Sequence, residues 1–212
     1  MLIMVVLCYN DNQIIMEMTV YMVISARPEL VLASGSPRRR EILTRLGYDF
    51  RIHTSDAPED DVSGSVTDMV YTLAKRKAGA VAELEQNCIV IGADTLVALA
   101  GKPLGKPSDK ADAVRMLTAL SGRTHEVATG ICLINTVTGK ELASYEVTTV
   151  SFRDLTPKEI TDYVATGEPM DKAGAYAIQG GAGKFIKSIN GSYDNIVGFP
   201  SELFTELLKQ IY

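Results

Sequence analysis

The stretch CIVIGADTLVAL, residues 88–99, carries the strongest indication of the fold. Its first six residues, CIVIGA, form a continuous apolar run, which is typical of a strand buried on both faces of a sheet. Asp94 and Thr95 follow directly, and the extended pattern resumes over residues 96–99. The stretch therefore predicts a central strand that carries a carboxylate just beyond its most apolar part.

On the N-terminal side of this strand, short apolar runs alternate with helical patterns. Residues 29–33 predict a buried strand, and Ser36 is placed to cap a helix whose first residue is Pro37. Gly47 is placed to end that helix. The other elements predicted here are a strand over residues 48–53, an acidic loop over 54–64 and a long helix over 67–86.

On the C-terminal side the predicted strands are longer. A capping box from Thr156 to Glu159 opens a helix that Gly167 ends. The other predicted elements are a loop over 101–107, a helix over 109–120 capped by Ser108 and ended by Gly122, strands over 124–135 and 141–153 joined at Thr138 and Gly139, a hairpin of 176–179 with 185–189, and an amphipathic helix over 200–212. Together these elements indicate an α/β protein with a mixed, twisted sheet flanked by helices.

The composition indicates a single globular unit. The 212 residues are 46% hydrophobic and 22% charged, whereas a disordered chain has fewer apolar residues and more net charge. A net charge of −5 argues against a general binder of nucleic acid or anionic membranes. Three cysteines without a CxxC pair argue against a disulfide framework or a zinc knuckle, and favour a reducing cytoplasm.

Residues 1–24 differ from the rest of the chain and form an N-terminal extension to a domain over 25–212. Eighteen of them are apolar and five are methionine, and no basic residue precedes Arg27. A secretory signal would need a positive start, and the apolar run is interrupted at residues 10–13. The extension is either an extra strand or hairpin, or a stretch translated upstream of a start at Met16, Met18 or Met22. We favour the second interpretation.

Three arginines, Arg38–Arg40, begin the helix that follows Ser36. A helix N-terminus carries partial positive charge and normally favours acidic residues, so this placement is unfavourable unless an anion binds there. Backbone N–H groups, serine hydroxyls and arginine side chains would then hold a phosphate group. The alternative is a solvated basic turn in which Glu41 pairs with Arg45. Both interpretations stay open at this point.

Asp94 is a second residue in an unfavourable position, because an unpaired carboxylate after a buried strand costs free energy. It is either a metal ligand or general base, or an Asp that caps the following turn. Lys75 and Arg76 are interpreted as a solvated helix face, whereas periodicity alone does not place Lys77. The acidic loop is interpreted as solvent-facing, although it could supply one oxygen ligand to Mg²⁺.

The sequence lacks the motifs of several common classes of enzyme and nucleotide-binding protein. The sequence contains no GxxxxGK[ST], GxGxxG, HExxH or GxSxG pattern, and its two histidines, His53 and His125, are interpreted as structural. The remaining groups are carboxylates, lysines, arginines and a phosphate-binding turn. That set suits metal-assisted attack on a phosphoanhydride.

Six short motifs, in this order, resemble the Maf family of nucleoside triphosphate pyrophosphatases from about Leu30 to the C-terminus. They are LASGSPRRREIL (32–43), IGADTLV (91–97), GKP (105–107), LSGRTHEV (120–127), EPMDKAGAYAIQG (168–180) and INGSYDNIVGFP (189–200). The resemblance implies two lobes around a deep cleft, similar to the inosine triphosphatase architecture. It also implies hydrolysis between the α- and β-phosphates with Mg²⁺ or Mn²⁺, a homodimer and a link to septum formation.

The resemblance also implies roles for individual residues. Asp94 matches the proton acceptor, and Glu59 matches a carboxylate that binds metal together with it, although Asp60 or Asp61 could substitute for Glu59. The triphosphate would be bound by Ser34, Arg38, Arg39, Lys77 and Lys106. Substrate preference would depend on Arg38, Thr95 and Gln179, a combination that looks like the branch acting on dTTP and UTP.

Two other classes of function compete with this hypothesis. A nucleotide-sensing protein that regulates cell division would use the same phosphate-binding turn with little catalysis, and Asp94 would be dispensable. A nucleic-acid-binding module is disfavoured by the acidic composition and the absence of tryptophan.

Overall fold

The computed structural model describes residues 9–10, 13–14 and 28–212. Most of the predicted extension, and with it the question of its start, lies outside the described residues. Within the extension, strands β1 (Tyr9–Asn10) and β2 (Gln13–Ile14) pair in antiparallel fashion. Over the described part of the chain, no helix is both long and apolar enough to cross a bilayer.

A seven-stranded sheet forms the centre of the molecule. Its order is β4-β3-β5-β7-β8-β9, with β6 also paired to β5. The strands are β3 (Glu29–Leu32), β4 (Phe50–Ile52), β5 (Cys88–Leu99), β6 (Lys102–Leu104), β7 (Thr124–Asn135), β8 (Glu141–Phe152) and β9 (Ile186–Asn190). β3 is parallel to β4 and β5, whereas all other pairs are antiparallel, so the predicted mixed sheet is confirmed.

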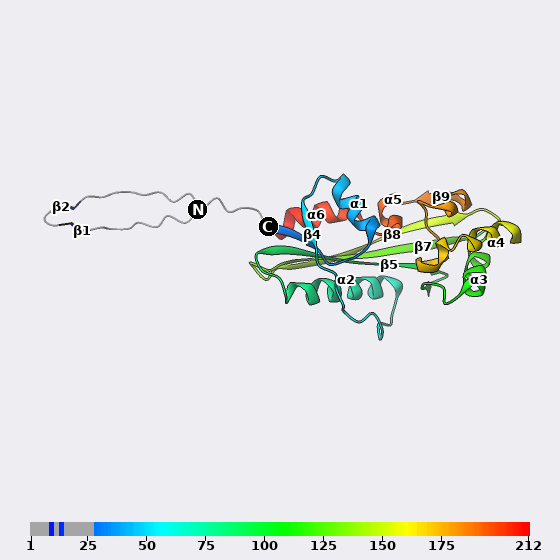
Figure 1. The fold of residues 1–212 in the computed structure, drawn as a ribbon, viewed down its shortest axis with the longest axis horizontal. Helices are drawn as coiled ribbons and strands as arrows, with labels where there is room; N and C mark the ends of the chain where they lie inside the picture. Colours follow the sequence, from blue (N-terminus) through cyan, green and yellow to red (C-terminus); the bar gives the residue numbers. More distant parts are fainter. Residues whose placement is uncertain (1–8, 11–12, 15–27) are drawn as a thin grey trace.

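Helices lie on both faces of the sheet (Figure 1). One face carries α2, and the other carries α1 and α6, while α3 and α4 gather at the far end. The α-helices are α1 (Pro37–Arg45), α2 (Val66–Ala82), α3 (Lys110–Leu120), α4 (Pro157–Ala165), α5 (Tyr193–Val197) and α6 (Ser201–Ile211). Short 3₁₀ helices are η1 (Glu168–Asp171), η2 (Ala173–Ala175) and η3 (Gly181–Phe185).

Local signals fixed most helix ends. The capping box between Thr156 and Glu159 is present, and Gly47 and Gly167 have the positive φ that ends a helix. The predicted cap at Ser108 is wrong, because the Asp109 side chain accepts from the backbone of Asp112 instead. An Asp carboxylate accepts this bond as readily as a serine hydroxyl, and it lies one residue closer to the helix.

Two other predictions are corrected by the sheet. The hairpin of 176–179 with 185–189 does not form, because β9 pairs with the distant strand β8 and residues 181–185 form η3. The predicted loop over 101–107 contains β6, which folds back onto the end of β5.

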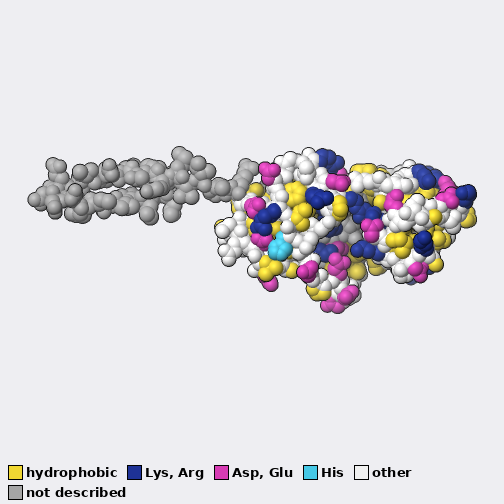
Figure 2. All heavy atoms as spheres, viewed as in Figure 1, with side chains coloured by type: hydrophobic (Ala, Val, Ile, Leu, Met, Phe, Trp, Pro, Cys, Tyr) yellow, Lys and Arg dark blue, Asp and Glu magenta, His cyan; other side chains and the backbone are white. Residues whose placement is uncertain are grey.

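The hydrophobic core divides into two main clusters along the sheet. One packs α1 and α6 against the strands, around Phe199 and Phe204, and the other packs α3 and α4 around Phe152 and Phe185. Figure 2 shows the surface hollowed between these two parts, with basic side chains gathered at the hollow. The hollow lies where the two lobes meet.

Candidate functional site

A break in the pairing of β5 creates the site. On one edge, β5 pairs with β3 up to Ile91 and with β6 from Val97 onward, while β7 covers the other edge throughout. Residues 92–96 therefore have an open edge between two neighbouring elements. Ligands of α/β proteins commonly bind where neighbouring strands diverge in this way.

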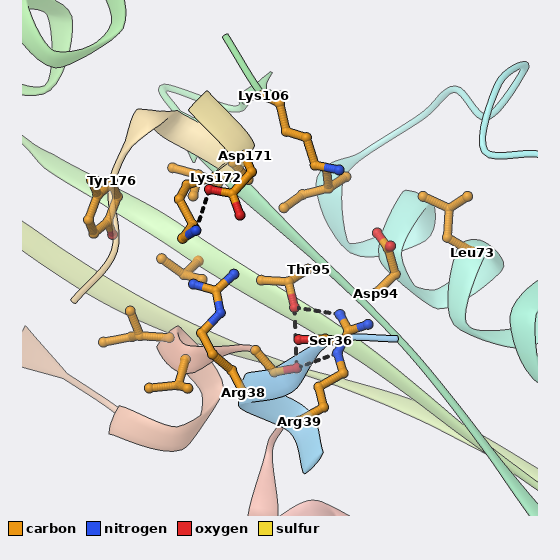
Figure 3. Close-up of a pocket in the computed structure, with 18 of the residues that line it drawn as sticks. Ser36, Arg38, Arg39, Leu73, Asp94, Thr95, Lys106, Asp171, Lys172 and Tyr176 are labelled. Carbon is orange, nitrogen blue, oxygen red and sulfur yellow. Dashed lines mark hydrogen bonds and ion pairs between the residues drawn. The ribbon is translucent and has the colours of Figure 1, made fainter. Parts of the chain in front are cut away.

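A cavity of about 690 Å³ lies over this open edge. Five basic and three acidic side chains line it, together with an apolar part. The charged residues are Arg38, Arg39, Lys77, Lys106, Lys172, Glu59, Asp94 and Asp171; the apolar ones include Leu73, Val97, Val127, Tyr176 and Ile196. Figure 3 shows Arg38, Arg39, Asp94, Lys106, Asp171 and Lys172 converging from α1, β5 and the turns on either side.

Two glycines bring α2 close enough to β5 to build the site. A Cβ on Gly92 would lie 2.3 Å from the Ala74 carbonyl oxygen, and one on Gly130 would lie 2.1 Å from that of Val70. Only glycine allows this close approach of helix and sheet. Asp94 lies two residues beyond Gly92 on the same strand, and so it faces α2 and Lys77.

Lys77 joins two carboxylates in the cavity. Its Nζ lies 2.6 Å from Asp94 Oδ1 and 2.7 Å from Glu59 Oε1. The Lys77 and Asp94 side chains are only 12% and 10% exposed, whereas Glu59 reaches in from the acidic loop and is 60% exposed. The hydrogen bond from Lys77 is the main reason that the pKa of Glu59 lies below its usual value.

The N-terminus of α1 faces the cavity without a side-chain cap. Ser36 occupies the cap position, as predicted, but its hydroxyl makes no capping bond and no acidic residue lies in the first turn. The helix dipole and free N–H groups are therefore available to an anion. The alternative pairing of Glu41 with Arg45 is wrong, because Arg45 bonds to Asp194.

Arg39 is held rigidly by three partners. Its Nε donates to the Gly198 carbonyl at 2.9 Å, Nη1 to Ser34 Oγ at 2.9 Å and Nη2 to Thr95 Oγ1 at 3.3 Å. Burial lowers the pKa of the Arg39 guanidinium, and the charge of Asp94 opposes this shift. Ser34 itself is buried behind the arginine and helps to position it.

Arg38 and Lys106 line the cavity, and their side chains make no hydrogen bond or ion pair with any residue that the structure describes. Arg38 comes from α1, and Lys106 comes from the loop after β6 (Figure 3). Two unpaired cations at one cavity favour an anionic ligand with several charges.

Comparison with known proteins shows the family of this chain. The sequence profile of the family described as "Maf-like protein" matches residues 29–211. The chain belongs to the Maf family. A dTTP/UTP pyrophosphatase of Thermococcus gammatolerans is 52% identical over 178 residues, 84% of this chain and 94% of that protein. One of Desulforamulus reducens is 48% identical over 181 residues, 85% of this chain and 95% of that protein.

Two of the predicted site residues of this Maf protein do not line the cavity. Ser34 is buried and is linked to the cavity through its hydrogen bond from Arg39. Gln179 does not join the others. Its side chain is exposed and is not part of the cavity lining, although the preceding residue, Ile178, is. The structure also distinguishes the three acidic loop residues. Glu59 contacts Lys77, whereas Asp61 bonds to Arg76 outside the cavity and Asp60 is exposed.

Sequence reasoning missed the part of the site supplied by η1 and η2. Asp171 and Lys172 pair with each other at the cavity, and Tyr176 forms part of its wall. The Gly174 N–H donates to the Gly105 carbonyl at 3.0 Å, which joins this turn to the loop of Lys106. These residues lie within a recognised motif, so the motif could have pointed to them although no local pattern assigned them a role.

A divalent cation fits the donors that are present. Among the described residues no group of three or more His, Cys, Asp or Glu side chains could hold a metal ion. Asp94 and Glu59, however, both approach one point, the Lys77 ammonium. Mg²⁺ is usually held by one or two carboxylates together with substrate phosphates and water, so two carboxylates at a phosphate site suffice.

Proposed function

We propose that this Maf protein hydrolyses dTTP and UTP to the nucleoside monophosphate and pyrophosphate. The observation that carries the proposal is the Asp94–Lys77–Glu59 group, which lies beside Arg39 and two unpaired cations in one cavity. The named relatives support the substrate class, because they are dTTP/UTP pyrophosphatases at about half identity over most of their length.

In this proposal Asp94 is the general base. Its carboxylate lies in the middle of β5, at the open edge of that strand, and is held by Lys77, so it is positioned to take a proton from the water that attacks the α-phosphorus. The bond between the α-phosphorus and the bridging oxygen breaks, and pyrophosphate leaves. Arg38, Arg39 and Lys106 would neutralise the negative charge that develops on the phosphate oxygens.

Asp94 and Glu59 would hold the divalent metal, Mg²⁺ or Mn²⁺. When bound, such an ion supplies charge neutralisation at the phosphates and lowers the pKa of coordinated water. The uncapped N-terminus of α1 would bind the terminal phosphates. A cytoplasmic location remains a prediction from the cysteine content, and a homodimer and a role in septation remain predictions from the family resemblance.

The apolar part of the cavity would receive the sugar and base. It is lined by Val97, Val127, Tyr176 and Ile196, and the whole cavity is within the usual size range for a small ligand. Arg38 and Thr95 line the same cavity and remain proposed specificity residues. Gln179 remains one on sequence grounds, and it would act from outside the present lining.

A panel of nucleoside triphosphates tests the proposal. We expect the protein to release pyrophosphate from dTTP and UTP with Mg²⁺ and to prefer them over CTP, ATP and GTP. The Asp94→Asn variant should bind UTP but turn it over at least about 100-fold more slowly, because it lacks the base. Binding of UTP without turnover by the wild type would contradict the proposal and favour a nucleotide sensor.

A further inference from the structure

Thr129 is a buried polar residue next to the site that the proposed reaction does not use. It lies in the middle of β7 with no exposed surface. In the sheet register it is paired with Thr95, and paired residues on neighbouring strands point to the same face. Thr95 lines the cavity and Thr129 does not, so any effect of Thr129 on a ligand passes through Thr95.

The shortest hydrogen bonds around Thr129 share one consistent direction. The Arg39 guanidinium only donates, so Thr95 Oγ1 accepts from it at 3.3 Å. The Asn195 carbonyl only accepts, so the Thr129 hydroxyl donates to it at 3.1 Å. Because each hydroxyl has one proton, Thr129 can only accept in the 3.0 Å contact between the two threonines, and we assign the Thr95 proton to this contact because it is shorter than that of Thr95 with the Gly198 carbonyl.

The Thr95 proton is therefore directed into the protein. Its other available acceptor, the Gly198 carbonyl, also belongs to the protein and lies at 3.5 Å, the limit of a hydrogen bond. Thr95 lines the cavity, and with its proton used inside the protein its hydroxyl can only accept a hydrogen bond from a ligand.

We propose that Thr129 is a positioning residue that makes Thr95 an obligate acceptor for the base. This inference rests on the proposed function. At Thr95 such a site favours the N3–H of uracil and thymine and disfavours cytosine, whose N3 is itself an acceptor. A polar site built for one pattern of donors and acceptors rejects the base that leaves a group unpaired.

A purely structural role for Thr129 makes a different prediction. The hydrogen bond from Thr129 to Asn195 also joins α5 to the sheet. If that were its only role, loss of the Thr129 hydroxyl would change stability and leave the preference between bases unchanged. The Asn195 carbonyl, however, also accepts the Gly198 N–H at 3.0 Å. Removing the Thr129 hydroxyl therefore does not leave this buried carbonyl without a partner, and the fold should persist.

The test compares the ratio of kcat/KM for UTP to that for CTP. In Thr129→Val, which keeps the side-chain shape, we expect the ratio to fall about three- to tenfold, since Thr95 regains a proton that can be donated to cytosine N3. Thr129→Ser should restore the wild-type ratio. Thr148→Val is the matched control, because the buried Thr148 hydroxyl contacts Ser192 and Asn195 but not Thr95.

An unchanged ratio in an active Thr129→Val protein, or an equal fall in Thr148→Val, would overturn the role of Thr129. If the valine variant does not fold, Thr129→Ala carries the same expectation. Failure of the wild type to hydrolyse UTP would count against the proposed function instead. The dissociation constants of UTP and CTP analogues with a non-hydrolysable α,β-bridge would then test Thr129 by the same ratio.

Discussion

At the scale of single residues, Asp94 and Lys77 respond differently to substitution. Lys77→Met leaves the Asp94 and Glu59 carboxylates beside each other without their shared cation. Removing one partner of a buried pair costs about 3–5 kcal/mol, and we expect a loss toward the lower end because Glu59 is exposed. Asp94→Asn keeps Lys77 paired with Glu59 and should cost less.

Urea unfolding of the two variants measures this difference. Both should lose turnover of UTP, because one lacks the base and the other lacks the cation that positions it. If Asp94→Asn were as destabilised as Lys77→Met, the pairing of Lys77 with Glu59 would not compensate for the loss of the Asp94 charge.

His125 predicts a dependence of stability on pH. It is buried with its Nε2 at 2.8 Å from the Tyr176 hydroxyl and its Nδ1 without a partner, and burial lowers its pKa to about 4. The unfolded chain binds this proton near pH 6.5, so its contribution to stability is complete above that pH. Stability should fall by up to about 3 kcal/mol as the pH drops from 6.5 through 4.

Unfolding free energies of the wild type and His125→Gln at both ends of that range isolate this contribution. The variant should lose that part of the pH dependence, whereas His53→Gln, at the other and partly exposed histidine, should keep it. Equal pH dependence in the wild type and His125→Gln would contradict the assignment to His125.

Some site residues could be predicted from sequence, and others could not, for identifiable reasons. Asp94 stands out because a carboxylate directly after an apolar run needs a partner. Lys77 does not stand out from Lys75 and Arg76, because its environment depends on how closely α2 approaches the sheet. Lys172 enters the cavity from a turn whose position is set by contacts distant in sequence.

At the scale of elements, the contact of α2 with β5 and β7 controls the geometry of the site. Gly130→Ala would place a methyl group on the backbone of α2 at Val70 and displace the helix that carries Lys77. We expect a loss of about 1–3 kcal/mol in stability together with a lower kcat. Gly79→Ala is the matched control, since a Cβ there meets nothing within 4 Å and alanine favours a helix.

Thermal unfolding should therefore show lower stability for Gly130→Ala and higher stability for Gly79→Ala than for the wild type. UTP turnover should fall in Gly130→Ala. A stable, fully active Gly130→Ala protein would contradict the close approach of α2.

Element ends were predictable where the signal is local, and pairings were not where the partner is distant. The capping box at Thr156 and the glycine at Gly167 act within a few residues of the helix that they delimit. The pattern over 185–189 predicts a strand close to the observed β9, but β9 pairs with β8 rather than with residues 176–179. Nothing in the local pattern distinguishes these two partners.

At the scale of the whole molecule, the net charge and the site have opposite signs. The chain carries −5, yet basic side chains outnumber acidic ones in the cavity. Binding of a triphosphate should therefore weaken with ionic strength, because salt screens these charges over about 8 Å at physiological concentration. We expect KM for UTP to rise between about 0.05 and 0.5 M salt, with a much smaller change in kcat. A KM that does not respond to salt would contradict this account of binding.

The products formed from UTP in water enriched in oxygen-18 test the central claim most directly. The account predicts UMP and pyrophosphate, with the heavy oxygen in UMP because water attacks the α-phosphorus, and almost no product from Asp94→Asn. UDP with orthophosphate, label in the pyrophosphate, or undiminished turnover by Asp94→Asn would contradict it.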